Sequence, residues 1–226
     1  MTTTEIIELS LLLGIIVLLI ASQVIITAVY NKYSRIDASL PVTGKEVVEN
    51  MLNSNAITDV RLGYTAGNLD DHYNPKYKTI NLSKNSSRTN TIAGIAVAAH
   101  ETGHAIQDHT GYFMLKVRKF FAPITIVASK FVWITIFIGV LLQFFDLILL
   151  GLILMGITVL FQFITLPVEF DASKRAIAYL STVGYDEYTM KGIKKMLTAA
   201  AFTYVASTLA SLMQLLRFII RLRSDD

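Results

Sequence analysis

Three long apolar stretches constrain the fold of this chain more than any other feature. They cover residues 9–29, 120–142 and 147–166. A helix needs about 20 apolar residues to cross the roughly 30 Å hydrocarbon core of a bilayer, and each stretch has about that length. With 53% hydrophobic residues and a mean hydropathy of +0.52, the 226-residue chain is too apolar for an ordinary soluble domain. The sequence therefore predicts a mainly α-helical membrane protein.

The first stretch could be a transmembrane anchor or a cleaved signal peptide. No Lys or Arg precedes it, whereas Glu5 and Glu8 do, and its apolar core is longer than that of a signal peptide. We interpret residues 1–30 as an uncleaved N-terminal transmembrane anchor.

The second and third stretches are separated by a very short connection that contains Gln143 and Asp146. Residues 120–166 are therefore expected to form a transmembrane hairpin. Lys130 is costly in lipid, so it is expected either to extend toward the interface or to face the other helices. A fourth candidate, residues 197–216, is rich in Ala, Ser and Thr. It could be a span packed through small residues or a helix buried against the catalytic domain, so three to four transmembrane helices are expected.

Lys and Arg are distributed unevenly along the chain. Residues 31–119 hold eleven of them, whereas the N-terminal tail and the hairpin connection hold none. By the positive-inside rule, residues 31–119 and 167–195 are both expected in the cytoplasm. A fourth crossing would leave Arg217, Arg221 and Arg223 outside, which argues against it.

Residues 100–104 read His-Glu-Thr-Gly-His, an H-E-x-x-H pattern. Residues four apart lie on one face of an α-helix, so His100 and His104 can bind a single Zn²⁺. Glu101 lies beside the first ligand and can take a proton from a metal-bound water. With four His and seven Glu in the chain, about 0.002 such patterns are expected by chance. The alternative, a surface helix with two solvated histidines, is opposed by the apolar neighbours of the motif.

Two helices are expected around this motif. The apolar run 92–99 leads directly into His100 and predicts a buried helix, with Asn90 as N-cap and Gly111 as a left-handed C-terminal residue. Earlier in the chain, residues 43–46 have the capping-box spacing Thr-x-x-Glu, which predicts a short helix over about 44–53.

Three short strands are expected between these helices, at residues 59–62, 69–73 and 78–83. A turn at Gly67-Asn68 and a break at Asn74-Pro75 separate them. They should form a small antiparallel sheet beside the motif helix. A strand at the rim of a metal cleft could pair with an extended peptide, or it could simply cover the helix.

A catalytic zinc site uses three protein ligands and keeps one position open for water. The chain has no Cys, so the third ligand must be a histidine or a carboxylate. Glu169 is the favoured candidate, because it lies at the end of the third apolar stretch, where a rigid helix could bring it beside the motif. Its alternative role is an interfacial carboxylate paired with Lys174 or Arg175.

The other candidate donors are less suitable. On a continuous helix Asp171 points away from Glu169, so a role in orienting a ligand histidine is not favoured. Ser173 shares the face of Glu169 and could serve that role. His109 falls in the last helical turn, where a cation suits the helix dipole, and His72 is expected to be structural.

These motifs resemble those of the YugP-type membrane zinc metallopeptidases over nearly the whole chain. The resemblance is carried by LDDHYNP at 69–75, NLS at 81–83, AVAAHETGHAIQ at 96–107 and LPVEFDAS at 166–173. More distantly, the chain is similar to the HtpX-like membrane proteases. Those have a downstream Glu ligand in an E-F-x-A-D pattern and a Gly-Tyr-Asp stretch, here at residues 184–186.

The resemblance implies a gluzincin-like site in which His100, His104 and Glu169 bind Zn²⁺ and Glu101 is the general base. In one departure from the HtpX-like pattern, Ser173 replaces an Asp four residues after the Glu ligand. In another, Asp108 separates Gln107 from His109, where the YugP-type helix commonly continues Gln-His.

The expected organisation is an anchor at 1–30, a catalytic domain at 31–119, the hairpin at 120–166, and a third-ligand segment with a C-terminal helical region at 167–226. The predicted function is that of a membrane-embedded zinc-dependent endopeptidase that acts on a peptide or membrane protein. Its active site would lie on the cytoplasmic side of a bacterial-type plasma membrane. The alternative is a non-catalytic zinc-binding scaffold or assembly factor. The net charge of +3 gives no reason to expect nucleic acid as a partner.

Overall fold

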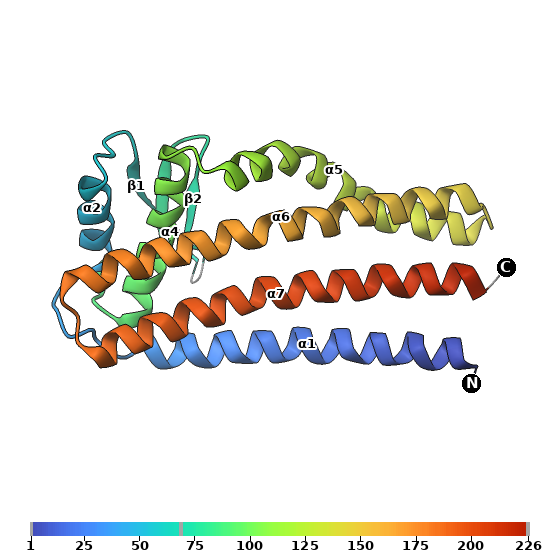
Figure 1. The fold of residues 1–226 in the computed structure, drawn as a ribbon, viewed down its shortest axis with the longest axis horizontal. Helices are drawn as coiled ribbons and strands as arrows, with labels where there is room; N and C mark the ends of the chain where they lie inside the picture. Colours follow the sequence, from blue (N-terminus) through green and yellow to red (C-terminus); the bar gives the residue numbers. More distant parts are fainter. Residues whose placement is uncertain (1, 68–69, 225–226) are drawn as a thin grey trace. The chain divides into compact units, whose positions relative to one another are not determined.

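The computed structural model describes residues 2–67 and 70–224, and it is mainly helical (Figure 1). The helices are α1 (Thr3–Tyr33), α2 (Gly44–Ser54), α3 (Lys84–Arg88), α4 (Ile92–His109), α5 (Phe113–Leu141), α6 (Phe145–Val183) and α7 (Glu187–Ser224). The strands are β1 (Arg61–Tyr64), β2 (His72–Asn74) and β3 (Thr79–Leu82). The expected mainly α fold with a small sheet is confirmed.

Four helices are long and apolar enough to cross a membrane, judged by length and composition: α1, α5, α6 and α7. The most apolar windows of the first three have a mean hydropathy of 2.2 to 2.8, whereas that of α7 has 1.5. The fourth apolar stretch of the sequence, at residues 197–216, is thus part of a helix that is long enough but less apolar. The number of crossings stays at the predicted three to four.

The chain forms two compact units. The first consists of Met1–Gln23, Lys116–Leu166 and Thr203–Asp226, and the second of Val24–Leu115 and Pro167–Phe202. The first unit contains parts of the four long helices. The second contains the sheet, α2, α3 and α4, together with the adjoining ends of α1, α6 and α7.

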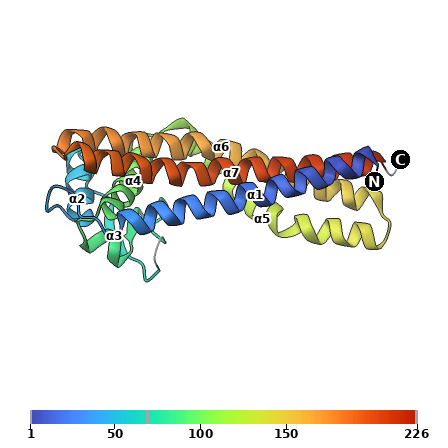
Figure 2. The same ribbon diagram turned by 90° about the horizontal axis from the view of Figure 1, so that it is seen from below.

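In the first unit, α5 and α6 form a helical hairpin (Figure 2), and its crossing of a membrane stays a prediction. Gln143 lies in the connection and has a left-handed conformation, with φ of 53°. Gly139 permits close packing, since a Cβ atom there would lie 2.8 Å from the backbone nitrogen of Ile148. Lys130 is exposed in this unit, as a side chain that extends toward the interface would be.

The sheet of the second unit has the strand order β1-β3-β2. β2 is antiparallel to β3, with His72 opposite Asn81, but β1 is parallel to β3, with Arg61 opposite Thr79. The prediction of an all-antiparallel sheet is therefore wrong for β1. The physical reason is that β3 is the central strand, with Ile80 fully buried, so β1 pairs with the edge of β3 that the β2–β3 hairpin leaves free. This pairing also shifts β1 two residues beyond the predicted segment, and the first residue of the predicted 69–73 strand lies outside the described residues.

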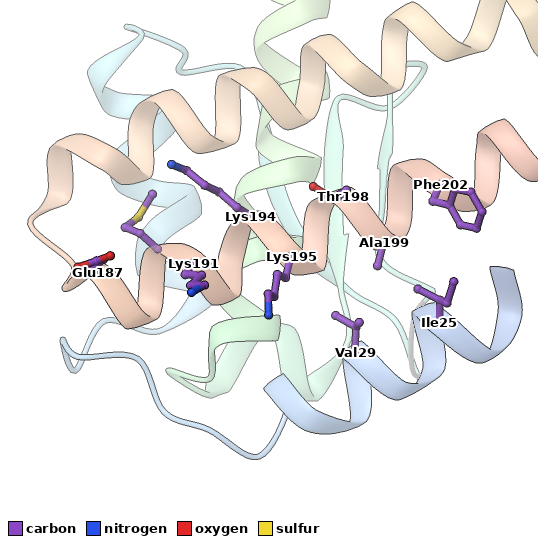
Figure 3. A pocket seen from close by; sticks show the side chains of 10 residues that line it. Ile25, Val29, Glu187, Lys191, Lys194, Lys195, Thr198, Ala199 and Phe202 are labelled. Atoms are coloured by element: carbon purple, nitrogen blue, oxygen red, sulfur yellow. The ribbon is translucent and has the colours of Figure 1, made fainter. Parts of the chain in front are cut away.

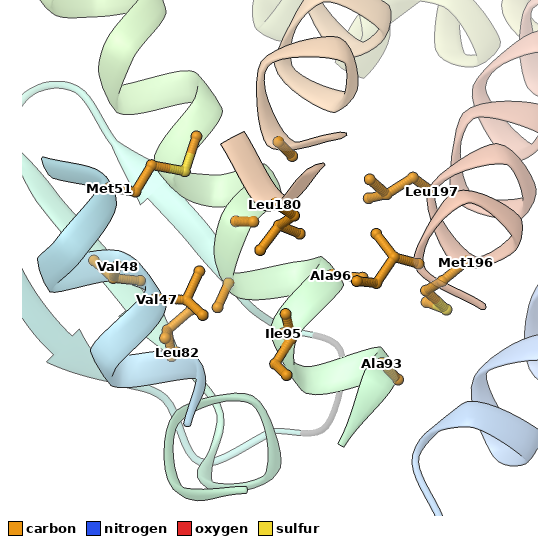
Figure 4. Close-up of a cluster of buried hydrophobic side chains, with 14 of the residues drawn as sticks. Val47, Val48, Met51, Leu82, Ala93, Ile95, Ala96, Leu180, Met196 and Leu197 are labelled. Atoms are coloured by element: carbon orange, nitrogen blue, oxygen red, sulfur yellow. The ribbon is translucent and has the colours of Figure 1, made fainter. Parts of the chain in front are cut away.

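Helix α4 runs through the hydrophobic core of the second unit (Figure 4). Its small side chains pack against α2 on one side and against α6 and α7 on the other. Because α4 is enclosed in this way, nearly all of its residues up to Gln107 are buried, which explains its apolar, alanine-rich sequence. The capping box of α2 forms as predicted between Thr43 and Glu46, and it orients the face of α2 that contains Val47 and Met51 toward the core.

The C-terminal end of α4 agrees with the prediction, whereas its N-cap differs. Gly111 follows the helix with φ of 65°, as predicted. At the other terminus the N-cap is Thr91 rather than Asn90, because the Thr91 hydroxyl accepts a hydrogen bond from the backbone N–H of Gly94. The Asn90 carbonyl instead accepts from the backbone N–H of Ala38, which ties α4 to the segment after α1.

Candidate metal centre

Two helices bring three metal-binding side chains together. His100 and His104 lie one turn apart on α4, and Glu169 lies on α6, which continues unbroken through Pro167. Glu169 Oε2 lies 3.3 Å from His100 Nε2 and 3.4 Å from His104 Nε2. The candidate ligand atoms of the three residues are all within 4.8 Å of one another. The residues that the sequence predicts as ligands are therefore adjacent in space.

The spacing between Glu169 and each imidazole fits zinc. Two ligand atoms at 2.0–2.1 Å from a tetrahedral Zn²⁺ are about 3.3–3.4 Å apart, which is the separation seen between Glu169 and each imidazole. Two imidazoles and one carboxylate also form a donor set that catalytic zinc sites use, with the fourth position open. Burial lowers the pKa of His104, but the hydrogen bond to Glu169 and the charges of Glu101 and Glu169 outweigh burial and raise it overall. The site thus favours a cation.

Gly103 allows the two helices to approach closely enough for this geometry. A Cβ atom at position 103 would lie 2.5 Å from the backbone oxygen of Ala172 on α6, where ordinary van der Waals contact starts at 3.4 Å. Any larger residue would separate α4 from α6. The second variable position of the motif is thus restricted by packing against α6, a requirement that comes from tertiary contact.

A chain of hydrogen bonds orients His104. Gln107 is fully buried, and its Nε2 donates to the backbone oxygen of Val168 at 2.7 Å and to Asp171 Oδ2 at 2.9 Å. Because Nε2 must be the donor to these two acceptors, Gln107 Oε1 faces His104 Nδ1, at 3.0 Å. His104 therefore carries its proton on Nδ1 and presents the Nε2 lone pair to the metal position. The side chain of Arg175 closes the chain by donating to Asp171 at 2.6 Å.

The contacts around the ligand histidines agree with the expectation for Ser173 and correct the one for Asp171. Ser173 Oγ lies 3.1 Å from His100 Nδ1, which agrees with its predicted role on the Glu169 face. Asp171, for which a role toward a ligand histidine was not favoured, acts on His104 through Gln107. Spacing along α6 alone could not show this, because Gln107 comes from α4 and bridges the gap. The signal in the sequence was an amide three residues after His104, on the same helical face.

The carboxylate of Glu101 is buried beside the two imidazoles. Glu101 is 9% exposed, and its Oε2 accepts a hydrogen bond of 2.8 Å from the backbone N–H of Tyr73 on β2. Burial raises the pKa of Glu101, while the charges of His100 and His104 act in the opposite direction. The group is thus held in place and is more basic than an ordinary carboxylate.

Strand β2 lies along α4 and is fixed to it at two points. Besides the bond from its N–H to Glu101, Tyr73 donates its hydroxyl to Asp108 Oδ2 at 2.8 Å. The two acceptors are seven residues apart, or about two helical turns. A strand beside the motif helix is thus present, as both predicted roles of the strand require, and its pairing with a peptide stays a prediction. Tyr73 was not expected to contact the site, because a backbone donor leaves no signal in the residue type.

The remaining histidines lie outside the centre. His72 is exposed on β2, with Nδ1 2.8 Å from the backbone oxygen of Asp70, and His109 is exposed in the last turn of α4. Within residues 2–67 and 70–224, His100, His104 and Glu169 form the one group of three or more His, Asp or Glu residues that could hold a metal ion.

Comparison with known families supports the chemistry of this centre. A family described as "Putative neutral zinc metallopeptidase" matches residues 8–223. The chain belongs to this family. Zinc is therefore the metal expected in this family, and the candidate centre of this chain has a donor set that suits zinc.

A curated relative gives the same answer. The chain is 40% identical over 191 residues to "Putative membrane protease YugP" of Bacillus subtilis (strain 168). The matched segment covers 84% of this chain and 85% of that protein. The resemblance to YugP-type metallopeptidases is thus confirmed. No solved structure matches the chain. Together with the four long apolar helices, the relative supports a zinc metallopeptidase of the membrane.

Proposed function

We propose that the chain is a membrane-embedded zinc endopeptidase with a gluzincin-like site. In this site His100, His104 and Glu169 are the metal ligands and Glu101 is the general base. The observation that carries the proposal is the convergence of the three ligand side chains beside a fourth side chain, the buried carboxylate of Glu101 on the motif helix. A site that only stores zinc has no need for that fourth group.

The mechanism follows from how the residues are held. When bound, Zn²⁺ supplies Lewis acidity that lowers the pKa of water and polarises a peptide carbonyl. The Tyr73 N–H occupies Oε2 of Glu101, which leaves Oε1 to take a proton from the attacking water. As the carbon–oxygen bond forms and the carbon–nitrogen bond breaks, Glu101 passes this proton to the leaving amine. The Gln107 and Ser173 contacts keep both imidazoles oriented through these steps.

The substrate is proposed to be a peptide or membrane protein that reaches the site from the cytoplasm. Residues 31–119 hold eleven Lys or Arg, and they include the motif helix. The segment that follows the third apolar stretch holds Glu169 together with Lys174 and Arg175. By the positive-inside rule, both parts of the site lie on the same, cytoplasmic side of the membrane. The proposed division of the chain is the anchor at 1–30, the catalytic domain at 31–119, the hairpin at 120–166 and the C-terminal segment at 167–226.

Glu101→Gln tests the proposal. The variant should keep about one zinc per chain, because the three ligands are unchanged, and it should lose peptide hydrolysis by a factor of roughly 10²–10⁴. Zinc content and cleavage of an unstructured protein are measured on the same purified samples. Glu49→Gln, the same change at an exposed site on α2, is the matched control and should keep both.

The outcomes separate the enzyme from a zinc scaffold. Hydrolysis that persists in zinc-loaded Glu101→Gln would remove Glu101 from the mechanism. A wild-type protein that holds zinc but cleaves no substrate from a diverse peptide mixture would favour the scaffold. Loss of zinc from Glu101→Gln would mean that this carboxylate binds the metal, contrary to the assigned role.

A further inference from the structure

A pocket of about 670 Å³ lies between α1 and α7 in the second unit, and its lining contains none of the candidate metal-site residues (Figure 3). Its volume falls in the range of sites that bind small molecules. One part of the lining is apolar and comes from both helices, with Ile25 and Val29 on α1 and Ala199 and Phe202 on α7. This part suits hydrocarbon.

The other part of the lining is basic. Lys191 and Lys195 lie one turn apart on the side of α7 that faces α1, while Lys194 leans over the opposite edge of the helix (Figure 3). All three are exposed, and within the described part of the chain no carboxylate lies within 4.0 Å of their ammonium groups. Glu187 is the one acidic lining residue, so three lysines against one carboxylate give this wall a charge of +2. A negatively charged group would compensate it.

The pocket lies at the ends of two candidate membrane spans. Its α1 residues are in the last third of Thr3–Tyr33, and its α7 residues are in the first half of the helix that starts at Glu187. The candidate span of α7 has 36 residues, or about 54 Å of helix, so it extends well beyond a hydrocarbon core of about 30 Å. From Lys191 to Phe202 the helix rises about 16 Å, which is about half of that core. If α7 crosses the membrane, this spacing sets the basic part at headgroup depth when the apolar part lies within one leaflet.

We propose that this pocket binds one anionic phospholipid. Lys191 and Lys195 contact the phosphate, and the acyl chains lie along Ile25, Val29 and Phe202 between the two helices. The combination of unpaired basic side chains and an apolar floor one leaflet deep matches an amphiphile with a negative headgroup. A free phosphate would leave the apolar floor without a function. A zwitterionic lipid would leave the +2 wall uncompensated.

A helix junction beside the pocket explains why such a lipid would stabilise the catalytic unit. Gly192 packs at a junction of three helices, where an added Cβ atom would lie 2.8 Å from Tyr33 Cε1 on α1 and 2.9 Å from Ile92 Cγ2 on α4. A lipid between α1 and α7 therefore holds together helices that contact the first residue of the motif helix. The inference concerns lipid binding and does not depend on peptide hydrolysis.

Binding of phosphatidylglycerol and phosphatidylcholine to the purified full-length protein in neutral detergent tests the proposal. Native mass spectrometry of lipid-stripped samples measures the affinity, and the melting temperature is recorded in parallel. Each Lys near an anionic lipid contributes about a fivefold increase in affinity, so Lys191→Gln with Lys195→Gln should weaken phosphatidylglycerol binding by roughly 25-fold. Lys76→Gln with Lys84→Gln removes two exposed charges outside the pocket and is the matched control, expected to have little effect.

Three results would overturn the proposal. Phosphatidylcholine that binds as tightly as phosphatidylglycerol would exclude recognition of the charge. Equal losses in the pocket variant and in the control would show a diffuse charge effect rather than a site. Full competition by inorganic phosphate would show an anion site with no lipid specificity. Phe202→Ala adds a test of the apolar floor, because it should weaken phosphatidylglycerol but not change any binding of phosphate.

Discussion

Gly103→Ala is the substitution whose effect follows most directly from the geometry of the centre. The new Cβ atom would lie 2.5 Å from the backbone oxygen of Ala172, and ordinary contact starts at 3.4 Å. Helix α6 must therefore move away from α4 by up to about 0.9 Å, the difference between these distances. Glu169 lies on α6 three residues before Ala172, so its carboxylate moves away from the imidazoles of α4. Metal–ligand distances tolerate only about 0.2 Å.

The expected size of the effect differs between stability and zinc binding. Alanine is favoured over glycine in a helix interior by about 1 kcal/mol, and overpacking of a core costs about 1–3 kcal/mol. The two effects oppose each other, so the free energy of unfolding should fall by only about 0–2 kcal/mol. Zinc affinity should fall by about 10- to 100-fold, as when the support of a metal ligand is disturbed. A folded protein with weakened zinc binding is thus the expected result.

Competition with a fluorescent chelator measures zinc affinity, and thermal unfolding measures stability. Gly156→Ala is the matched control, because Gly156 is also inside a long helix, but a Cβ atom added there would meet no other atom within 4 Å. It should leave zinc affinity unchanged. If Gly103→Ala bound zinc as tightly as the wild type, the close approach of α4 and α6 would not be what sets the ligand geometry.

Three further expectations follow from the site and the topology. Glu169→Ala should lower zinc affinity by more than about 100-fold, since loss of an outer partner of a ligand already costs 10- to 100-fold. His109→Ala should leave zinc affinity nearly unchanged. Equal zinc affinities of these two variants in a chelator competition would contradict the assignment of Glu169. Gln107→Ala should lower zinc affinity by about 10- to 100-fold. Asp171→Ala should lower it by less, because Asp171 acts on His104 through Gln107. A larger loss in Asp171→Ala than in Gln107→Ala, measured by the same competition, would disprove the hydrogen-bond chain. The chain has no native cysteine, so an impermeant thiol reagent on intact cells should label Asp146→Cys and not Asn85→Cys; labelling of Asn85→Cys from outside would reverse the proposed orientation.

Local sequence patterns were sufficient wherever the physical cause is itself local. The capping box of Thr43 and Glu46 and the left-handed Gly111 depend on hydrogen bonds and φ angles within a few residues. The hairpin of α5 and α6 follows from apolar length and a short connection. The pair His100 and His104 depends only on helical periodicity.

The third ligand needed more than a pattern. Glu169 was identifiable as a candidate because two histidines in a chain without cysteine need a further histidine or a carboxylate, and because it lies at the end of an apolar stretch. The distance of 3.3 Å between Glu169 and His100 depends on the packing of α6 against α4, which Gly103 permits. Periodicity within one helix contains no information about that packing.

The sequence by itself determined that the chain is helical, apolar enough for a membrane and equipped with a zinc motif, because these properties follow from composition and from spacing along one element. Only the tertiary structure decided the parallel pairing of β1 with β3, the bond from the Tyr73 N–H to Glu101, and the link of His104 to Asp171 through Gln107. Each of these joins segments that are well separated in the sequence. Their partners are selected by which surfaces become buried together, and residue type at either end leaves that choice open.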